Sequence, residues 1–232
     1  MLVGILTYLR DARWVWDTWG PVYNRRIYAA IVELYEHIVR EMTPAGPVRI
    51  LDVGAGRGYV SLLLASRNPQ ASIVGVDFSP FQVRSAERLR KARRIENVCF
   101  HRGNAMSLSF DEGAFDAAVS VGSVKHWPDA LQGLREIRRV LRPGGTVVMA
   151  ETDREVSDEA LRAFIRRFSI WFIPDALLFW GLRNVVFGGS FTQESLEFLV
   201  QTAGFESLSR HRIPTCPYVV VKARKPGRGD RT

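Results

Sequence analysis

The segment ILDVGAGRGYVSLLLA, residues 50–65, joins two apolar runs through three glycines at positions 54, 56 and 58. An apolar run that ends in a glycine-rich turn and continues as a helix is typical of the first strand, turn and helix of a parallel α/β sheet. The glycines allow a sharp turn and let a ligand approach the backbone, and the N-terminus of the following helix points at that ligand. The segment predicts a site for a nucleotide-like ligand.

The spacing of these glycines argues against two phosphate-binding loops. Dinucleotide-binding turns use G-x-G-x-x-G, whereas this turn reads G-x-G-x-G, and no G-K-[ST] follows for a P-loop. Asp52 lies just before the glycines, where a carboxylate would repel a pyrophosphate and attract an ammonium or sulfonium group. Asp77 ends the next apolar run, near the spacing at which doubly wound folds place the acid that holds ribose hydroxyls. These residues predict a ligand with a cationic group and a ribose, and Phe78 could cover its purine or pack in the core.

Apolar runs and helix-like stretches alternate along much of the chain. The runs cover residues 48–53, 72–76, 98–101, 114–121 and 146–150. Helices are predicted over residues 24–42, from a cap at Asp129 to about Arg142 before an RPGG turn, and from Thr192 to Gly204. The segments SLSRHRI and YVVVKAR read as a terminal strand pair. We therefore predict a Rossmann-like α/β fold: a doubly wound, mostly parallel seven-stranded sheet with an antiparallel terminal hairpin strand and helices on both faces.

The 232 residues are 47% hydrophobic, enough to bury one substantial core, so we expect one domain with embellishments. No stretch approaches the roughly 20 apolar residues that a membrane span needs. The predicted parts are an N-terminal helical lid or substrate segment (1–43), a ligand-binding core (44–151), a hydrophobic helical insertion (152–191), a C-terminal helix with terminal strands that complete the core (192–224) and a disordered tail (225–232).

Several ordered motifs resemble those of class I S-adenosylmethionine-dependent methyltransferases, and the general likeness is to the ubiquinone and menaquinone biosynthesis methyltransferases. The motifs are LDVGAGRG, VGVDFSP, GNA at 103–105, and FDAAVSVGSVKHWPD followed by LREIRRVLRPGGTVVMAE. The resemblance covers roughly residues 49–151. It implies that the core binds S-adenosyl-L-methionine and that the chain is a methyltransferase.

The resemblance also implies a role for individual residues near the first two motifs. Gly54 and Gly56 would contact the cofactor through their backbone. Asp52 would orient its amino group through water, and Asp77 would hold the ribose.

Further cofactor contacts are implied on other segments. Asn104 and Ala105 would meet the adenine edge, although many relatives have an acid where this chain has Asn104. Ser120 would lie at the end of the fourth strand beside the methionine moiety. Tyr23, in the N-terminal segment, could reach the cofactor carboxylate.

The catalytic residue is a separate prediction. His126 in SVKHWPD is the best-placed base if the acceptor is a phenol, a hydroxyl or an activated carbon, and a residue that fixes the loop is the alternative. Relatives often carry two histidines there, and Lys125 occupies the first of those positions. No NPPY or DPPY follows the fourth strand, which argues against methyltransferases of base or glutamine amino groups.

The insertion contains FSIWFIPDALLFWGLRNVVFGGSF, which is too interrupted to span a membrane. It could wall a pocket for a small lipophilic acceptor, such as a quinone precursor, an isoprenoid, a lipid or a natural product, or contact a membrane surface. Core packing or a homodimer contact is the alternative. The two cysteines show no metal-ligand spacing and cannot build a disulfide scaffold, which predicts no metal site and a cytoplasmic protein, with peripheral membrane contact left open.

The net charge of +8 could favour RNA or anionic lipid. We favour solvated helix faces as the explanation, because helices that flank a parallel sheet normally carry charges on their outer faces and no added RNA-binding module is recognisable. Two groups of basic residues carry the possibility of an anionic partner: Arg84, Arg88, Arg90, Lys91, Arg93 and Arg94, and then Arg135, Arg138, Arg139 and Arg142. The alternatives to a small-molecule methyltransferase are therefore an RNA methyltransferase that uses these faces and a non-catalytic S-adenosylmethionine-binding protein.

Overall fold

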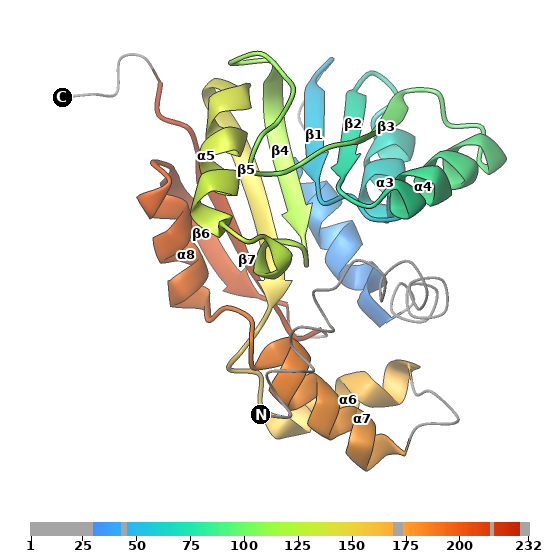
Figure 1. Ribbon diagram of the computed structural model, residues 1–232, viewed down its shortest axis with the longest axis vertical. Helices are drawn as coiled ribbons and strands as arrows, with labels where there is room; N and C mark the ends of the chain where they lie inside the picture. Colours follow the sequence, from blue (N-terminus) through green and yellow to red (C-terminus); the bar gives the residue numbers. More distant parts are fainter. Residues whose placement is uncertain (1–29, 43–45, 169–173, 214–215, 228–232) are drawn as a thin grey trace.

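The structure is a computed structural model that describes residues 30–42, 46–168, 174–213 and 216–227. These residues build a seven-stranded sheet in the order β3-β2-β1-β4-β5-β7-β6 (Figure 1). The first five strands pair in parallel, and β7 runs antiparallel to both β5 and β6. The strands are β1 (Arg49–Val53), β2 (Ser72–Asp77), β3 (Val98–Arg102), β4 (Phe115–Val121), β5 (Leu141–Thr152), β6 (Glu206–Arg212) and β7 (Tyr218–Arg224). The predicted fold class is confirmed.

Helices cover both faces of the sheet. Residues 30–42 are helical, and the named helices are α3 (Tyr59–Arg67), α4 (Pro80–Ala92), α5 (Ala130–Val140), α6 (Asp158–Phe168), α7 (Asp175–Gly181) and α8 (Gln193–Thr202), with a 3₁₀ turn η1 (Val124–His126) and a π-helical turn η2 (Leu182–Phe187). Helix 30–42 and α3 share one hydrophobic cluster, and α5 and α8 share the other. Alternate strand residues enter opposite clusters, as Ile50 and Leu51 do, because successive side chains of a strand point to opposite faces.

Two helix starts follow the sequence prediction closely. Asp129 accepts the backbone N–H of Gln132 at 2.9 Å and caps α5. Thr192 accepts the N–H of Ser195 at 3.0 Å, and the Ser195 hydroxyl accepts the N–H of Thr192, which makes a reciprocal cap for α8. Side-chain caps of this kind satisfy N–H groups that have no partner within the helix.

The RPGG segment, residues 142–145, does not form the predicted turn between helix and strand. Helix α5 ends at Val140, two residues early, and Leu141 already pairs with Phe115 on β4. The register then shifts, so RPGG is a bulge inside β5. Proline disfavours helical backbone in the residue before it, which explains why the helix ends ahead of Arg142.

The end of the folded core also differs from the prediction. Lys225, placed by composition in a disordered tail, is 7% exposed and donates from Nζ to the carbonyl of Leu141 at 2.6 Å. Its backbone pairs with Gly144 and Gly145. The bulge in β5 therefore provides the carbonyl and the ladder that hold this lysine, a long-range contact that composition does not reveal.

Helices α6 and α7 lie beyond the carboxyl ends of the parallel strands, at the lower edge of the view in Figure 1. Helix α7 has no buried residue, whereas Leu161, Phe164 and Ile165 of α6 are buried. The insertion thus adds a layer at the edge of the sheet where the loops after β1, β2 and β4 lie. No helix among the described residues is long and apolar enough to cross a membrane.

Candidate functional site

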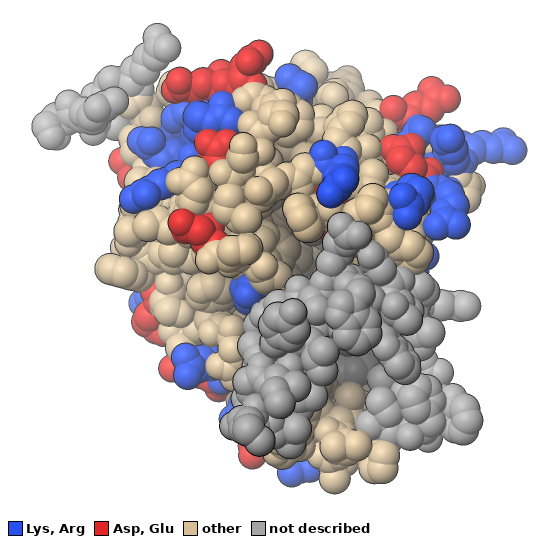
Figure 2. Space-filling model, viewed as in Figure 1, with Lys and Arg blue, Asp and Glu red and all other residues tan. Residues whose placement is uncertain are grey.

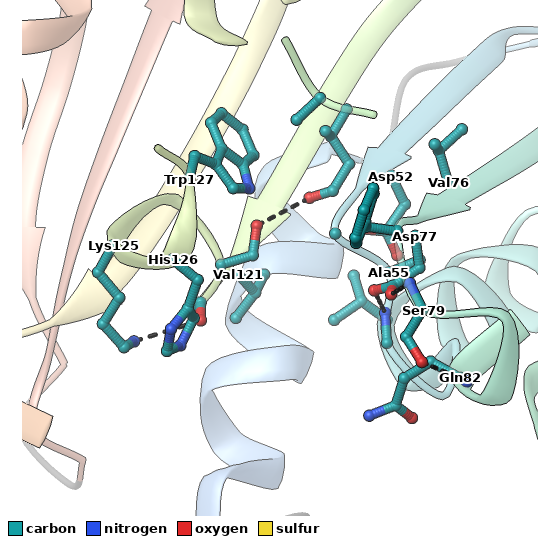
Figure 3. A pocket seen from close by; sticks show the side chains of 18 of the residues that line it. Asp52, Ala55, Val76, Asp77, Ser79, Gln82, Val121, Lys125, His126 and Trp127 are labelled. Atoms are coloured by element: carbon teal, nitrogen blue, oxygen red, sulfur yellow. Dashed lines mark hydrogen bonds between the residues drawn. The ribbon is translucent and has the colours of Figure 1, made fainter. Parts of the chain in front are cut away.

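A cavity of about 590 Å³ lies at the carboxyl ends of the parallel strands. Its walls are the loops after β1, β2, β3 and β4, the end of β5, helix 30–42 and η2. Ligands of open α/β sheets bind in this crevice, and the volume is that of a typical small-molecule pocket. Figure 3 shows Asp52, Asp77 and Gln82 on one side of the cavity and Lys125, His126 and Trp127 on the other.

The glycine loop after β1 is tied to the end of β2. Gly54 donates its N–H to the carbonyl of Val76 at 2.8 Å, and Gly56 donates to Asp77 Oδ2 at 2.8 Å. Gly54 has a φ of +76°, and a Cβ there would lie 2.1 Å from the Ser123 hydroxyl oxygen. A side chain at position 54 would therefore meet both backbone strain and the loop after β4.

The carboxylate of Asp77 shapes the loops on either side of it. Besides Gly56, it accepts the backbone N–H of Ser79 at 2.9 Å. Both bonds fix the carboxylate at the cavity wall, where the sequence predicted the ribose. Phe78 also lines the cavity and is 56% exposed, so its side chain is not packed in the core, and Arg102 lies 5.7 Å from its ring centre.

The Asp52 carboxyl is a buried acid of the cavity wall. It lines the cavity, is 2% exposed, and accepts the Ser61 hydroxyl at 2.5 Å. Burial raises the pKa of Asp52 to about 7, the Ser61 hydrogen bond opposes this rise, and the charge of Asp77 adds to it. A cation in the cavity would favour the ionised form, because an opposite charge stabilises a carboxylate.

Gln82 is a cavity residue that sequence reasoning missed. It lies in the first turn of α4, is 6% exposed, and its side-chain oxygen has no hydrogen-bond partner among the described residues. A buried polar atom without a partner costs free energy, so a ligand that donates a hydrogen bond here would be favoured. A ribose hydroxyl or a purine amino group has that chemistry. One feature of the sequence could have pointed to Gln82: it stands three residues after Ser79, which caps α4.

The remaining predicted cofactor residues differ in where they lie. Asn104 and Ala105 line the cavity, and the Asn104 side chain accepts the N–H of Met106 at 3.1 Å. Ser120 does not line the cavity: it is fully buried and its hydroxyl is 2.9 Å from that of Ser123, which does. Ser120 lies at the end of β4, as predicted, but Ser123 rather than Ser120 forms the cavity wall there. Tyr23 lies outside the described residues.

The turn after β4 brings an ion pair to the cavity. Lys125 Nζ lies 3.0 Å from Glu151 Oε2, and the two side chains are 5% and 0% exposed. Glu151 Oε1 also accepts the N–H of Val124 at 2.6 Å. His126 and Trp127 line the cavity beside this pair (Figure 3). The sequence placed His126 here, but it gave no sign that Glu151 of β5 would reach under η1.

A second group of titratable residues lies away from the cavity. His37 and Glu41 of helix 30–42 meet His211 of β6. A ring nitrogen of each histidine and a carboxylate oxygen of Glu41 lie within 4.8 Å of one another. Lys222 also binds Glu41, at 2.9 Å. Burial lowers the pKa of His37, and the neighbouring His211 adds to the effect. We interpret this group as the contact that joins the N-terminal helix to the antiparallel edge of the sheet.

The two basic groups have different surroundings. In the second group, Arg138 donates to the Gly204 carbonyl at 2.9 Å and Arg142 binds Asp116 at 2.6 Å, so these side chains are engaged within the protein. The first group lies on α4 and in the two residues after it, and five of its members are exposed: Arg84, Arg88, Lys91, Arg93 and Arg94. Figure 2 shows lysine and arginine side chains gathered at the right of the view. Both groups thus keep exposed arginines, and the first presents more of them.

Comparisons with known proteins agree with this geometry. A family profile described as a methyltransferase domain matches residues 50–145. The chain is 41% identical over 105 residues to a demethylmenaquinone methyltransferase of Thermus thermophilus, an alignment that covers 45% of this chain and 47% of that protein. It is 30% identical over 172 residues to the ubiquinone/menaquinone biosynthesis C-methyltransferase UbiE of Geobacter sp., covering 67% of this chain and 73% of the relative.

Among solved structures, the crystal structure of the [4+2]-cyclase SpnF is similar, with a TM-score of 0.71 and 23% identity over 92% of this chain and 94% of that one. At this identity the likeness concerns the fold alone. The chain spans about half of the Thermus relative's length and about three quarters of the Geobacter relative's length.

Proposed function

The chain belongs to the class I S-adenosylmethionine-dependent methyltransferases of the ubiquinone and menaquinone type, and from this premise we propose that it methylates a small lipophilic acceptor with a hydroxylated ring. One observation carries the proposal: a single cavity joins the acid and glycine loops of a cofactor site to an apolar wall and a polar turn. The first part suits S-adenosyl-L-methionine, and the second leaves room for an acceptor.

The residues of the nucleoside side fit the cofactor. Asp77 lies where a carboxylate can accept ribose hydroxyls, and the side-chain oxygen of Gln82, which no described residue contacts by a hydrogen bond, is a second acceptor on the same side of the cavity (Figure 3). Asn104 and Ala105 would meet the adenine, and the exposed ring of Phe78 would cover one of its faces. Asp52 would face the positively charged end.

S-adenosyl-L-methionine supplies a methyl group that its sulfonium already makes electrophilic. The protein therefore needs to align the acceptor with that group, exclude water, and manage one proton. His126 is our candidate to take this proton, because it lines the cavity on the side opposite Asp77 (Figure 3).

The acceptor side of the cavity is largely apolar and aromatic. Tyr35 of helix 30–42, Trp127, Val186 of η2 and Tyr218 of β7 line it. Rings and aliphatic side chains favour a lipophilic ligand. The names of the two relatives describe methyl transfer in quinone biosynthesis, which supports a hydroquinone as the first acceptor to test.

We propose that α6, α7 and η2 form the acceptor end of the site and its contact with a lipid surface. Leu177 and Trp180 on α7 are 59% and 37% exposed, and Arg162 and Arg166 are exposed on α6, where Arg162 lies over the ring of Phe179 of α7. Exposed apolar residues next to arginines suit a surface with anionic headgroups. An acceptor dissolved in the bilayer could then reach the cavity from this edge.

Transfer of a labelled methyl group from S-adenosyl-L-methionine tests the proposal. Reduced demethylmenaquinone in detergent should acquire the label and yield S-adenosylhomocysteine in equal amount. Total RNA, with and without RNase, is the parallel acceptor. Label in RNA alone would replace our proposal by the RNA alternative, and tight cofactor binding without transfer to any acceptor would support a non-catalytic role.

A further inference from the structure

The Lys125 ammonium lines the cavity with one donor to spare. Its Nζ donates to Glu151 Oε2 at 3.0 Å and to the Gly122 carbonyl at 3.2 Å. An ammonium has three N–H donors, so one of them has no partner among the described residues. The side chain is 5% exposed, which means that bulk water does not freely supply the missing acceptor.

Burial of the Lys125–Glu151 ion pair carries a cost in desolvation free energy. Taking two charges from water costs several kcal/mol per ion, and the mutual attraction offsets this only when the remaining hydrogen bonds are made. Each oxygen of Glu151 accepts one hydrogen bond, Oε2 from Lys125 and Oε1 from the N–H of Val124. The ammonium keeps one N–H without a partner among the described residues, and an anionic or polar oxygen is its complement.

The surroundings of Lys125 place that oxygen on the acceptor side. Gly122 has no side chain, and a Cβ there would lie 3.8 Å from Lys125 Nζ and 3.7 Å from the Tyr218 hydroxyl. The space beside both polar groups is thus left open. Asp77 and Gln82, the residues suited to the nucleoside, lie across the cavity (Figure 3).

We propose that Lys125 forms an oxyanion site that binds the phenolate oxygen of a hydroxylated aromatic ligand, with Glu151 as the positioning residue that holds the ammonium in place. This inference rests on the proposed function for its biological meaning, but the site itself binds an anion without any methyl transfer. The ligand binds as its anion, and the proton of the phenol passes to the buffer.

The probe is p-nitrophenol, whose anion absorbs at a longer wavelength than the neutral phenol. At a pH below the pKa of the free probe, binding to the wild type should raise the fraction of anion. Glu151→Gln keeps an oxygen for the Val124 N–H but turns its NH2 group toward Lys125, so it no longer holds the ammonium in place and should weaken anion binding. The double variant Lys125→Met with Glu151→Gln buries no unpaired charge, and it should weaken anion binding at least about tenfold, as expected for the loss of a hydrogen bond to a charged group.

Lys222→Met is the matched control, since Lys222 pairs with Glu41 outside the cavity and should leave the spectrum unchanged. A wild type without the spectral shift, or a double variant that keeps it, would overturn the inference. S-adenosyl-L-methionine affinity is measured in parallel on each variant. If the double variant fails to bind S-adenosyl-L-methionine while the wild type binds it, Lys125 holds the cofactor carboxylate and the inference is wrong. If the wild type itself does not bind S-adenosyl-L-methionine, the proposed function is contradicted instead.

Discussion

The carboxylate of Asp77 accepts the backbone N–H of Gly56 at 2.8 Å, which joins the end of the second strand to the glycine loop after the first. The same carboxylate also accepts the N–H of Ser79. An acid in this position sets the shape of the loop before any ligand arrives. We propose that the same carboxylate accepts the ribose hydroxyls of the cofactor.

Asp77→Ala should weaken S-adenosyl-L-methionine binding by about 1.5–3 kcal/mol, the range for a hydrogen bond to a charged group. Asp77→Asn keeps one oxygen acceptor, so its affinity for S-adenosyl-L-methionine should lie between those of the wild type and Asp77→Ala. Calorimetric titration gives both values. Asp116→Ala is the control, since that acid binds Arg49 and Arg142 at the opposite edge of the sheet. An unchanged affinity in Asp77→Ala would remove the ribose role.

Asp52 should make cofactor binding depend on pH. Its pKa is raised to about 7 in the unliganded site, and a bound cation would lower it, so affinity should rise as the pH increases through about 7, with release of a proton. Titration in buffers of different ionisation enthalpy measures that proton. Asp52→Asn should bind with little pH dependence in this window.

The same group predicts how unliganded stability changes with pH. The folded chain keeps a proton on Asp52 that the unfolded chain releases near the usual pKa of 3.8. The contribution of Asp52 to the free energy of unfolding is therefore greatest below pH 3.8 and falls as the pH rises to about 7. Comparison of wild-type and Asp52→Asn denaturant midpoints across this range isolates the effect. A difference between them that does not vary with pH would contradict the raised pKa.

Gly54→Ala should lower the stability of the protein by more than the strain of its positive φ alone would cause. Gly54 and Gly144 share a φ of +76°, but a Cβ at Gly54 would lie 2.1 Å from the Ser123 hydroxyl and one at Gly144 would meet nothing within 4 Å. Gly144→Ala should cost about 1–2 kcal/mol of stability. Gly54→Ala should cost more and should displace Ser123, and addition of Ser123→Gly should recover the excess. Equal costs for the two glycines would show that the contact does not matter.

His126→Gln should leave cofactor affinity unchanged and lower turnover roughly 10²-fold or more, the usual contribution of a general base. His101→Gln, on β3 and outside the cavity wall, is the matched variant. A His126 variant with wild-type turnover would make it a residue that fixes the loop.

Leu177→Ser with Trp180→Ser should reduce binding to vesicles that contain anionic lipid, measured by sedimentation. Phe198→Ser controls for the loss of an exposed apolar group, because Phe198 on α8 is 71% exposed on another part of the molecule. Equal effects of both changes, or none, would contradict a lipid contact through α7.

Local signals in the sequence predicted most of the fold because capping and turn residues mark where its helices and strands begin and end. Asp129 and Thr192 cap their helices as predicted, and the alternation of apolar runs with helix-like stretches predicted the mostly parallel sheet. The errors lie where a distant contact decides the outcome. Lys225 is held by a bulge in β5, and Pro143 ends α5 earlier than the apolar pattern suggests.

The candidate site shows the same division. Asp52, Gly54, Gly56 and Asp77 could be placed from one short motif and one strand end, since neighbouring parallel strands bring their carboxyl ends to the same edge of the sheet. Three features required the tertiary structure: the unpartnered oxygen of Gln82, the burial of Ser120 and the reach of Glu151 to Lys125. Each depends on side chains from different elements, which spacing along one segment does not encode.

Calorimetric titration of the purified protein with S-adenosyl-L-methionine, with NAD as the control ligand, tests the central claim most directly. We predict micromolar, one-to-one binding of S-adenosyl-L-methionine, no binding of NAD, and a weaker interaction in Asp77→Ala. If S-adenosyl-L-methionine did not bind, or if NAD bound equally well, the cavity at the ends of β1 and β2 would not be the cofactor site described.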